Sequence, residues 1–157
     1  MIQSFRSPAF IEGHPIPARH TEDGEDLSPA LSWSGPPKGT KELALIVDDP
    51  DAPTAEPWVH WLIYNIPADS TGLEEGIPRT PTLEKHAGAL QGKNTWGTIG
   101  YRGPAPPKGH GTHHYHFKLY ALDSPLSVGP GIDKRTLLEA MSGHVLGQKE
   151  MVGTYQR

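Results

Sequence analysis

Acidic residues and histidines gather in two short segments of the chain, and these residues have the types and spacing that could do chemistry. The first segment, 45–61, contains three aspartates and then His60. The second segment, 100–115, contains a loop rich in proline and glycine that ends in a cluster of histidines. Each segment places an apolar stretch typical of a β-strand beside its loop. This layout predicts a rigid polar pocket at the rim of a sheet, suited to a small anionic group.

The aspartates of the first segment could orient a histidine. Asp49 begins the run Asp49-Pro50-Asp51-Ala52-Pro53. Aspartate before proline commonly satisfies backbone N–H groups in a turn, which is the alternative interpretation. A carboxylate beside an imidazole would fix the tautomer of the ring and favour its protonated form. A protonated imidazole favours an anion, so we expect binding to weaken as pH rises through the histidine pKa.

The loops beside the two strands look stiff. The loop 103–111 does not match the GxxxxGK[ST] pattern of a nucleotide phosphate loop, and no helix pattern follows it. Its glycines would let backbone N–H groups approach a ligand, and its prolines would stiffen the pocket wall. Ala52–Pro53 and Glu56–Pro57 are candidates for cis peptide bonds, because X–Pro bonds adopt that form at low cost.

Metal binding and nucleophilic catalysis find little support in the sequence. Alternation along a strand places two of the clustered histidines, His114 and His116, opposite His113, and no known zinc spacing is present. The chain has no cysteine and no Gly-x-Ser-x-Gly motif. We therefore expect no metal, no cofactor and no catalytic residue. Acid–base chemistry by Asp49 and His60 stays open as an alternative.

Two strands are expected to carry the ends of these segments. The apolar run within 42–48 is unbroken, which predicts a central strand that is buried on both faces. The segment 115–122 alternates strongly, and His113 falls in phase with its buried positions if the strand starts early.

A further strand is predicted over 59–66. Strict alternation places His60 on the same face as Leu62 and Tyr64. A lone histidine in such a strand is more often structural, but the neighbouring histidines and acids favour a role in the pocket.

The C-terminal part predicts one helix, and a second short one. Asp133 is a suitable N-cap for a helix over about 134–142, and a second short helix could cover part of 144–150. The tail 151–155 has the pattern of a last strand. The chain is therefore expected to be mostly β, with one or two short helices.

The bulk properties bound the class of protein. The 157 residues fit one domain, 1–157, and the net charge of −4 argues against nucleic-acid binding. No apolar run approaches the roughly 20 residues that span a bilayer, so we expect no membrane insertion. The lack of cysteine and of a pattern like a secretory signal at the start predicts a cytoplasmic protein.

At the two segments the chain resembles the phosphatidylethanolamine-binding protein family, which includes Raf kinase inhibitor protein, and within it the compact bacterial and archaeal branch. The motifs that carry the resemblance are Asp49-Pro50-Asp51-Ala52-Pro53, Trp58-Val59-His60-Trp61 and 103–115. Further similarity lies in 28–35, 39–41 and 92–94, so the resemblance covers nearly the whole chain.

This resemblance implies two packed antiparallel β-sheets with short peripheral helices and a small anion pocket at one end. The polar centre of the pocket would be Asp49, His60 and His113. The residues lining it would be Tyr115, Pro53, Gly103 and Pro107. His114 stands where relatives usually have arginine, and the chain stops short of the C-terminal helix of eukaryotic members. Recognition of a particular kinase is therefore not expected.

The implied function is non-enzymatic binding of a small anionic or phosphorylated ligand, such as phosphate, a phosphoethanolamine-type head group or a phosphorylated side chain. The protein would regulate a partner and, by resemblance, form a homodimer. One alternative is inhibition of a protein kinase or serine protease through surface loops, with the polar segment 68–96, read as a long surface excursion, as the candidate element. Another is weak hydrolysis of phosphoesters.

Overall fold

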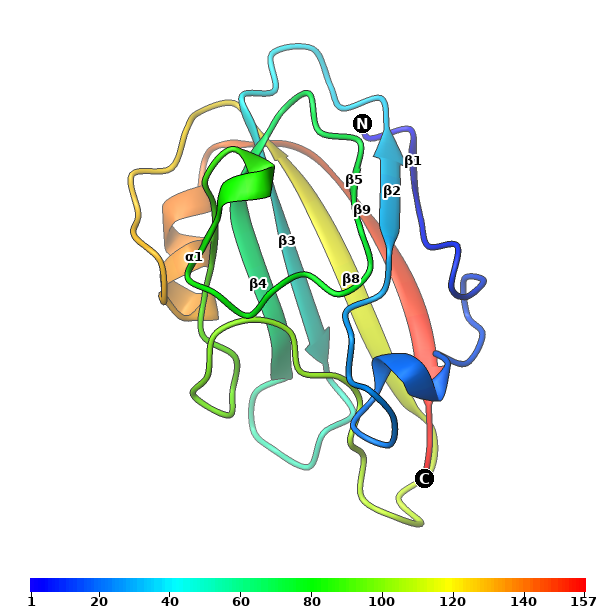
Figure 1. Cartoon of the computed structure of the whole chain (residues 1–157). Coiled ribbons are helices and arrows are strands. Elements are labelled where there is room, and N and C mark those ends of the chain that lie inside the picture. Colours follow the sequence, from blue (N-terminus) through cyan, green and yellow to red (C-terminus); the bar gives the residue numbers. More distant parts are fainter.

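Two antiparallel sheets build this protein, as a computed structural model that describes residues 1–157 shows (Figure 1). The large sheet has the strand order β6-β7-β4-β3-β8-β9, and the small sheet has the order β1-β2-β5. The strands of the large sheet are β3 (Glu42–Asp49), β4 (Trp58–Pro67), β6 (Thr82–Leu83), β7 (Ala89–Gln91), β8 (His113–Leu122) and β9 (Val145–Tyr155). Those of the small sheet are β1 (Ser4–Arg6), β2 (Leu31–Ser34) and β5 (Gly72–Leu73). The predicted mostly β fold with two sheets is confirmed.

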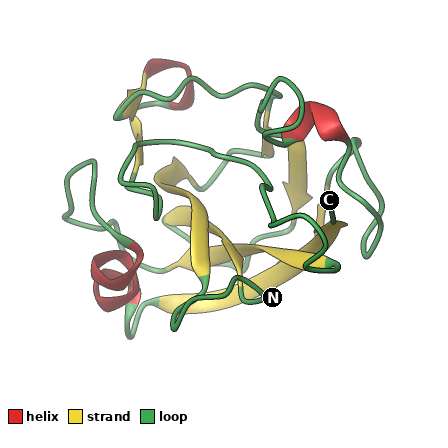
Figure 2. Cartoon of the chain, turned by 90° about the horizontal axis from the view of Figure 1, so that it is seen from below, coloured by secondary structure: helices red, strands yellow, loops and turns green.

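Helices are few and lie at the periphery of the strands (Figure 2). They are the α-helix α1 (Lys134–Met141) and the 3₁₀ turns η1 (Ala18–His20) and η2 (Glu84–His86). No helix in the structure is long and apolar enough to cross a membrane.

The main core lies between the two sheets. Residues Leu43, Leu45 and Val47 of β3 face this core, and Phe5 and Trp33 of the small sheet close it from the other side. The opposite side chains of β3 enter a second cluster beneath α1. Since β3 is buried on both faces and lies between β4 and β8, the predicted central strand is confirmed.

The predicted strands that carry the site are found with small shifts at their ends. Strand β8 does start early, so His113 is in phase with Tyr115 and is buried, whereas His114 is exposed. The antiparallel register pairs Asp48 of β3 with His116 of β8. The end of β3 and the start of β8 therefore lie side by side.

Helix α1 begins where it was predicted, because the Asp133 carboxylate accepts a hydrogen bond from the Thr136 N–H at 2.9 Å. The predicted second helix within 144–150 is wrong. Gly143 has φ 83°, which ends α1, and the chain then pairs with β8 along its whole length as β9. The free edge of the long strand β8 outweighs the weak helical pattern of that segment.

The interpretation of 68–96 as a surface excursion is also wrong in part. This segment contributes β5 to the small sheet and β6 and β7 to the large one. Gln91 of β7 is buried, and its side-chain oxygen accepts a hydrogen bond from the indole N–H of Trp61 at 2.7 Å. The segment is tied to the core despite its polar composition.

The predicted cis bonds at Ala52–Pro53 and Glu56–Pro57 are wrong, since the structure contains no cis peptide bond. The trans form is favoured at X–Pro bonds by roughly 0.5–1 kcal/mol. The loop 50–57 makes its turn with trans bonds throughout.

Candidate ligand-binding site

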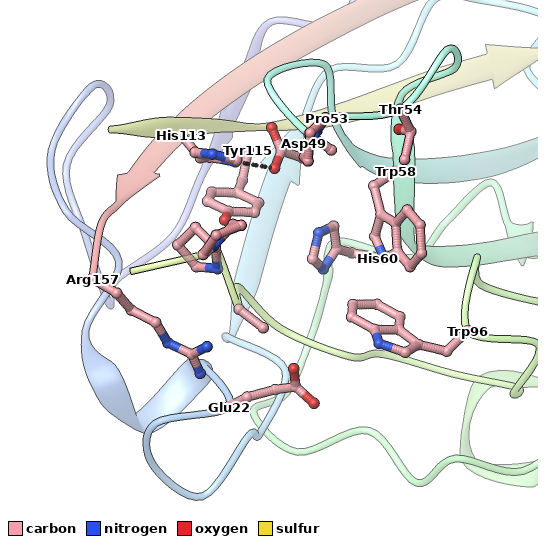
Figure 3. Close-up of a pocket in the computed structure, with 14 residues that line it drawn as sticks. Glu22, Asp49, Pro53, Thr54, Trp58, His60, Trp96, His113, Tyr115 and Arg157 are labelled. Carbon is pink, nitrogen blue, oxygen red and sulfur yellow. Dashed lines mark hydrogen bonds and ion pairs between the residues drawn. The ribbon is translucent and has the colours of Figure 1, made fainter. Parts of the chain in front are cut away.

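A cavity of about 380 Å³ opens at the rim of the large sheet, where β3 ends and β4 and β8 begin (Figure 3). It is lined by Glu22, Asp49, Ala52, Pro53, Thr54, Trp58, His60, Trp96, Ala105, Pro106, Pro107, His113, Tyr115 and Arg157. Of the seven residues expected from the sequence, the structure brings six to this cavity. Gly103 is the exception, because it does not line the wall.

Asp49 and His113 form the buried polar centre. The Nδ1–H of His113 donates to Asp49 Oδ2 at 2.6 Å, and the other carboxylate oxygen accepts from the Asp51 N–H at 2.8 Å. The side chains are only 5% (Asp49) and 2% (His113) exposed, so water competes little for this contact. The contact fixes the tautomer of His113 and leaves its Nε2 for another partner.

That partner is His110. Its Nδ1 lies 2.6 Å from Nε2 of His113. Because one of two hydrogen-bonded nitrogens must donate and the other accept, a single proton lies between the two rings. The chain Asp49–His113–His110 thus connects a buried carboxylate to an exposed imidazole.

A β-bulge places His60 in the cavity. Strand β4 pairs Trp61 with Val47 and Val59 with Asp48, so His60 is an extra residue opposite the bond between them. Its ring centroid lies 5.1 Å from that of Tyr115, which faces the main core. Leu62 and Tyr64 belong to the cluster on the other face of the sheet. The expectation that His60 shares their face is therefore wrong, because the bulge breaks the alternation.

The tautomer of His60 follows from its hydrogen bond. Nδ1 lies 2.6 Å from the backbone carbonyl oxygen of Arg102, and a carbonyl can only accept. Burial lowers the pKa of His60, and it outweighs the opposing effects of the Arg102 carbonyl and of the charges on Asp49 and Glu22. The expected imidazolium is thus not found at His60, which is neutral around neutral pH.

Aromatic rings form much of the wall. The Trp96 ring packs edge-on against both Trp58 and His60, with centroid distances of 5.4 Å and 5.1 Å. Burial raises the pKa of the Tyr115 hydroxyl, so it stays protonated and can donate to a ligand. Sequence reasoning missed Trp58 and Trp96 as lining residues, although Trp58 stands two residues before His60.

The charges around the cavity come from distant parts of the chain. Arg157 is the one Lys or Arg side chain in its lining, and it bonds Asp23 at 2.9 Å. Glu22 bonds Arg102 at 2.7 Å, and the Arg102 guanidinium stacks 4.6 Å above the Trp96 ring. Sequence reasoning missed Glu22 and Arg157. Arg157 could have been found from the pairing of His113 with Tyr155, because this pairing brings the residues after Tyr155 close to the cavity. The pairing was not predicted.

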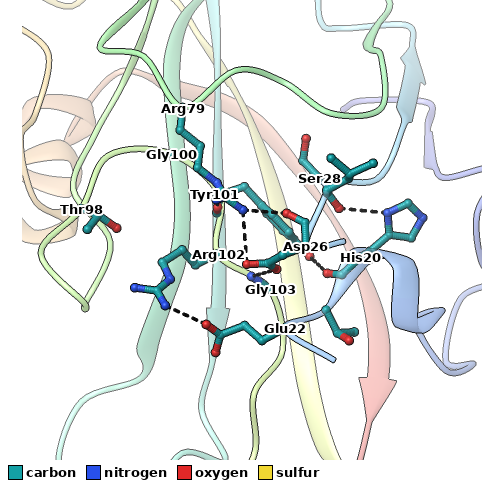
Figure 4. A network of polar contacts seen from close by, with 12 residues as sticks. His20, Glu22, Asp26, Ser28, Arg79, Thr98, Gly100, Tyr101, Arg102 and Gly103 are labelled. Atoms are coloured by element: carbon teal, nitrogen blue, oxygen red, sulfur yellow. Dashed lines mark hydrogen bonds and ion pairs between the residues drawn. The ribbon is translucent and has the colours of Figure 1, made fainter. Parts of the chain in front are cut away.

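Gly103 does not line the cavity, but it positions the cavity wall (Figure 4). Its N–H donates to Asp26 Oδ1 at 2.8 Å, and Arg79 bonds the same carboxylate at 3.2 Å. A Cβ atom at position 103 would meet the carbonyl oxygen of His20 at 2.2 Å. Only glycine fits this close approach, and Gly103 thereby fixes the start of the loop that carries Pro106 and Pro107.

The other acids and histidines of the two segments point elsewhere. Asp48 lies on the opposite face of β3, where Lys134 and Lys118 bond its carboxylate at 2.7 Å and 3.2 Å. His114 bonds Asp51 and His116 bonds Glu150, both on the outer face of the sheet. The histidine cluster therefore diverges, and only His110 and His113 contact one another.

Comparisons with known proteins agree with this fold. The family model described as "Phosphatidylethanolamine-binding protein" matches residues 6–156, and the chain belongs to this family. A UPF0098 protein of Methanothermobacter thermautotrophicus is 53% identical, covering 98% of this chain and 99% of the relative.

Two solved structures are similar as well. Escherichia coli YbcL, described as a member of the mammalian PEBP family, has a TM-score of 0.92 and 34% identity, over 99% of this chain and 98% of the other. A putative PEBP homologue from Chlamydia trachomatis, CT736, has a TM-score of 0.86 and 41% identity, over 98% and 96%.

Proposed function

We propose that this protein binds a small phosphorylated ligand in the cavity without transforming it. The observation that carries the proposal is the arrangement of one guanidinium, Arg157, and one phenolic donor, Tyr115, around a buried polar centre. Both groups can donate to an anionic oxygen. The volume of about 380 Å³ suits a head group or a phosphorylated side chain and lies in the range of small-molecule sites.

Binding is favoured over turnover by the state of Asp49. Both of its oxygens are already hydrogen-bonded, to His113 and to the Asp51 N–H. Asp49 is therefore not free to act as a general base, and the lining contains no serine or cysteine that could attack a phosphoester. We therefore propose a recognition site, whose occupancy regulates a protein partner, as the family resemblance suggests.

The cytoplasmic location and the homodimer stay predictions. Cell fractionation tests the first, and analytical ultracentrifugation across a range of protein concentrations tests the second. A monomer at every concentration would contradict the homodimer and leave the pocket proposal intact.

Calorimetry tests the proposal directly. Phosphate and phosphoethanolamine are titrated at pH 6 into the wild type and into a His60→Ala/His113→Ala variant whose folding is checked by circular dichroism. Saturable binding to the wild type that is lost in the folded variant is the expected result. Binding of equal strength in both proteins would contradict the proposed site. Incubation of phosphoethanolamine with the wild type should release no phosphate.

A further inference from the structure

His60 offers the ligand a lone pair instead of a proton. Its Nδ1–H donates to the Arg102 carbonyl oxygen at 2.6 Å, so a neutral ring carries its lone pair on Nε2. Nε2 has no hydrogen-bond partner in the protein. The fully buried side-chain atoms without such a partner are Asp48 Oδ1 and Asn65 Oδ1, so Nε2 is not fully buried. Because the ring lines the cavity, Nε2 is the polar atom that His60 can present to a ligand.

The groups around His60 define its charge state. Asp49 approaches it from β3, Glu22 from the loop before β2, and Tyr115 from β8, while Arg102 bonds it from the opposite loop. The charge on Asp48 acts on it from the other face of β3. The carboxylates favour the protonated ring, but burial to 3% exposure opposes it more strongly. Over the neutral range the ring therefore remains an acceptor.

Two further acceptors belong to the lining. These are the carboxylates of Asp49 and Glu22, against the single cation Arg157. A fully deprotonated phosphate would meet a lone pair and two carboxylates, of which Glu22 is paired with Arg102 and Asp49 with His113. A monoester that keeps one proton meets them differently, because its P–OH can donate to Nε2 while its charged oxygens bond Arg157 and Tyr115. The second pKa of a phosphate monoester is about 6, so this form is readily available near neutral pH.

We propose that the pocket selects phosphate monoesters in the singly protonated form, because the acceptor Nε2 of His60 requires a hydrogen-bond donor on the ligand. The inference rests on the proposed function and adds a rule for its ligand. The phosphodiester of a phospholipid has no P–OH, so the rule favours free monoesters over intact lipid head groups. Sulfate esters, which carry no proton, are rejected.

Two matched monoanions test the rule. The monoanion of methyl phosphate has the same shape and charge as methyl sulfate, and only the first has an acidic O–H; at pH 6 about half of the methyl phosphate is in this form. We expect calorimetry to show at least tenfold tighter binding of methyl phosphate. Dimethyl phosphate, which stands for the lipid diester, should bind as weakly as methyl sulfate. Equal affinity for all three would overturn the inference and leave the proposed function standing, whereas no binding of any would remove both.

An ammonium group on the ligand could donate the hydrogen bond to Nε2 of His60 in place of the P–OH. 2-Aminoethyl sulfate carries an ammonium and no acidic O–H, and phosphoethanolamine carries both. The proposal predicts that phosphoethanolamine binds at least tenfold more tightly. Equal affinity would show that the ammonium is the donor, which overturns the selection of a protonated phosphate and points to a zwitterionic lipid head group.

The protonation state of the bound ligand can be observed in the wild type. We expect the ³¹P resonance of bound methyl phosphate to stay at the position of the monoanion at pH 8, where the free ligand is a dianion. The affinity should fall by about tenfold per pH unit above the second pKa of the ligand. A bound resonance at the dianion position would contradict the proposal.

A substitution isolates Nε2. In His60→Asn the amide can still donate to the Arg102 carbonyl, but no atom replaces Nε2. The preference for methyl phosphate over methyl sulfate should then collapse to within about twofold, while methyl sulfate binds no more weakly than before. A preference that survives in the folded variant would assign the selection to another group.

Discussion

The two pocket histidines, His113 and His60, differ in the groups that accept their Nδ1–H hydrogen bonds. His113 donates to a buried carboxylate, whereas His60 donates to an uncharged carbonyl. Burial lowers the pKa of His60, although the charges on Asp49 and Glu22 favour its protonated form. Within one cavity, His113 is therefore paired with Asp49 and His110, whereas Nε2 of His60 is left without a partner in the protein.

Stability at acid pH should report the neutral His60. Its pKa in the folded state lies below the ordinary value of 6.5, so the unfolded chain binds a proton that the folded chain does not. The free energy of unfolding is then unaffected above about pH 6.5 and falls as pH drops below it, by at most about 1.4 kcal/mol per pH unit from this group. The measurement is urea denaturation from pH 8 to 5.

His60→Asn is the matched variant, because asparagine at position 60 does not titrate in this range. Its unfolding free energy should depend less on pH than that of the wild type between pH 6.5 and 5. The same slope in both proteins would show that other groups account for the acid sensitivity.

At the scale of elements, the site depends on two irregularities. The bulge in β4 turns His60 toward Tyr115, and the contact of Gly103 with Asp26 fixes the Pro-rich wall. Burial raises the pKa of Asp26, although the Gly103 N–H and Arg79 oppose the shift. A regular strand and a freely moving loop would not bring these groups to one cavity.

Gly103→Ala should therefore disrupt the wall. The added methyl group would meet the His20 carbonyl oxygen at 2.2 Å, a backbone atom that cannot move aside cheaply. We expect a loss of roughly 1–3 kcal/mol in unfolding free energy, together with weaker binding of methyl phosphate. The matched control is Gly129→Ala, since nothing lies within 4 Å of a Cβ there and its φ is ordinary. Equal stability of the two variants would contradict the account of the loop.

The sequence predicted the regular elements well and the irregular ones poorly. The apolar run of β3 and the alternation of β8 sufficed to place Asp49 and His113, because buried strands show clear patterns. The bulge at His60 has no such pattern, since it arises from the register between β3 and β4. Glu22 and Arg157 lie far from the motifs, and only the folded chain brings them to the cavity.

At the scale of the whole molecule, the last strand completes the site. Strand β9 pairs with β8 from Val145 to Tyr155 and thereby delivers Arg157 to the cavity. The Arg157 guanidinium is bonded to Asp23 and lowers the pKa of that carboxyl. A protein with a net charge of −4 thus keeps one positive group at the mouth of an otherwise acidic pocket.

Arg157→Gln should weaken ligand binding more than it weakens the fold. Loss of a charge-assisted hydrogen bond of about 1.5–3 kcal/mol corresponds to a fall in methyl phosphate affinity of roughly tenfold to a hundredfold. The unfolding free energy should change little, because exposed ion pairs contribute little. Lys108→Gln is the control, since it makes the same change in net charge and Lys108 does not line the cavity. Equal losses of affinity in the two variants would point to a general effect of charge.

The most direct test of the central claim is a two-dimensional ¹H–¹⁵N NMR titration of the wild type with methyl phosphate at pH 6. The account predicts saturable shifts that are largest at the amides of His60, His113 and Tyr115 and at the Trp58 and Trp96 indoles, with the outer-face residues His116 and Glu150 unaffected. Shifts that do not saturate, or that map to another face of the protein, would contradict a phosphate-binding pocket at this rim of the sheet.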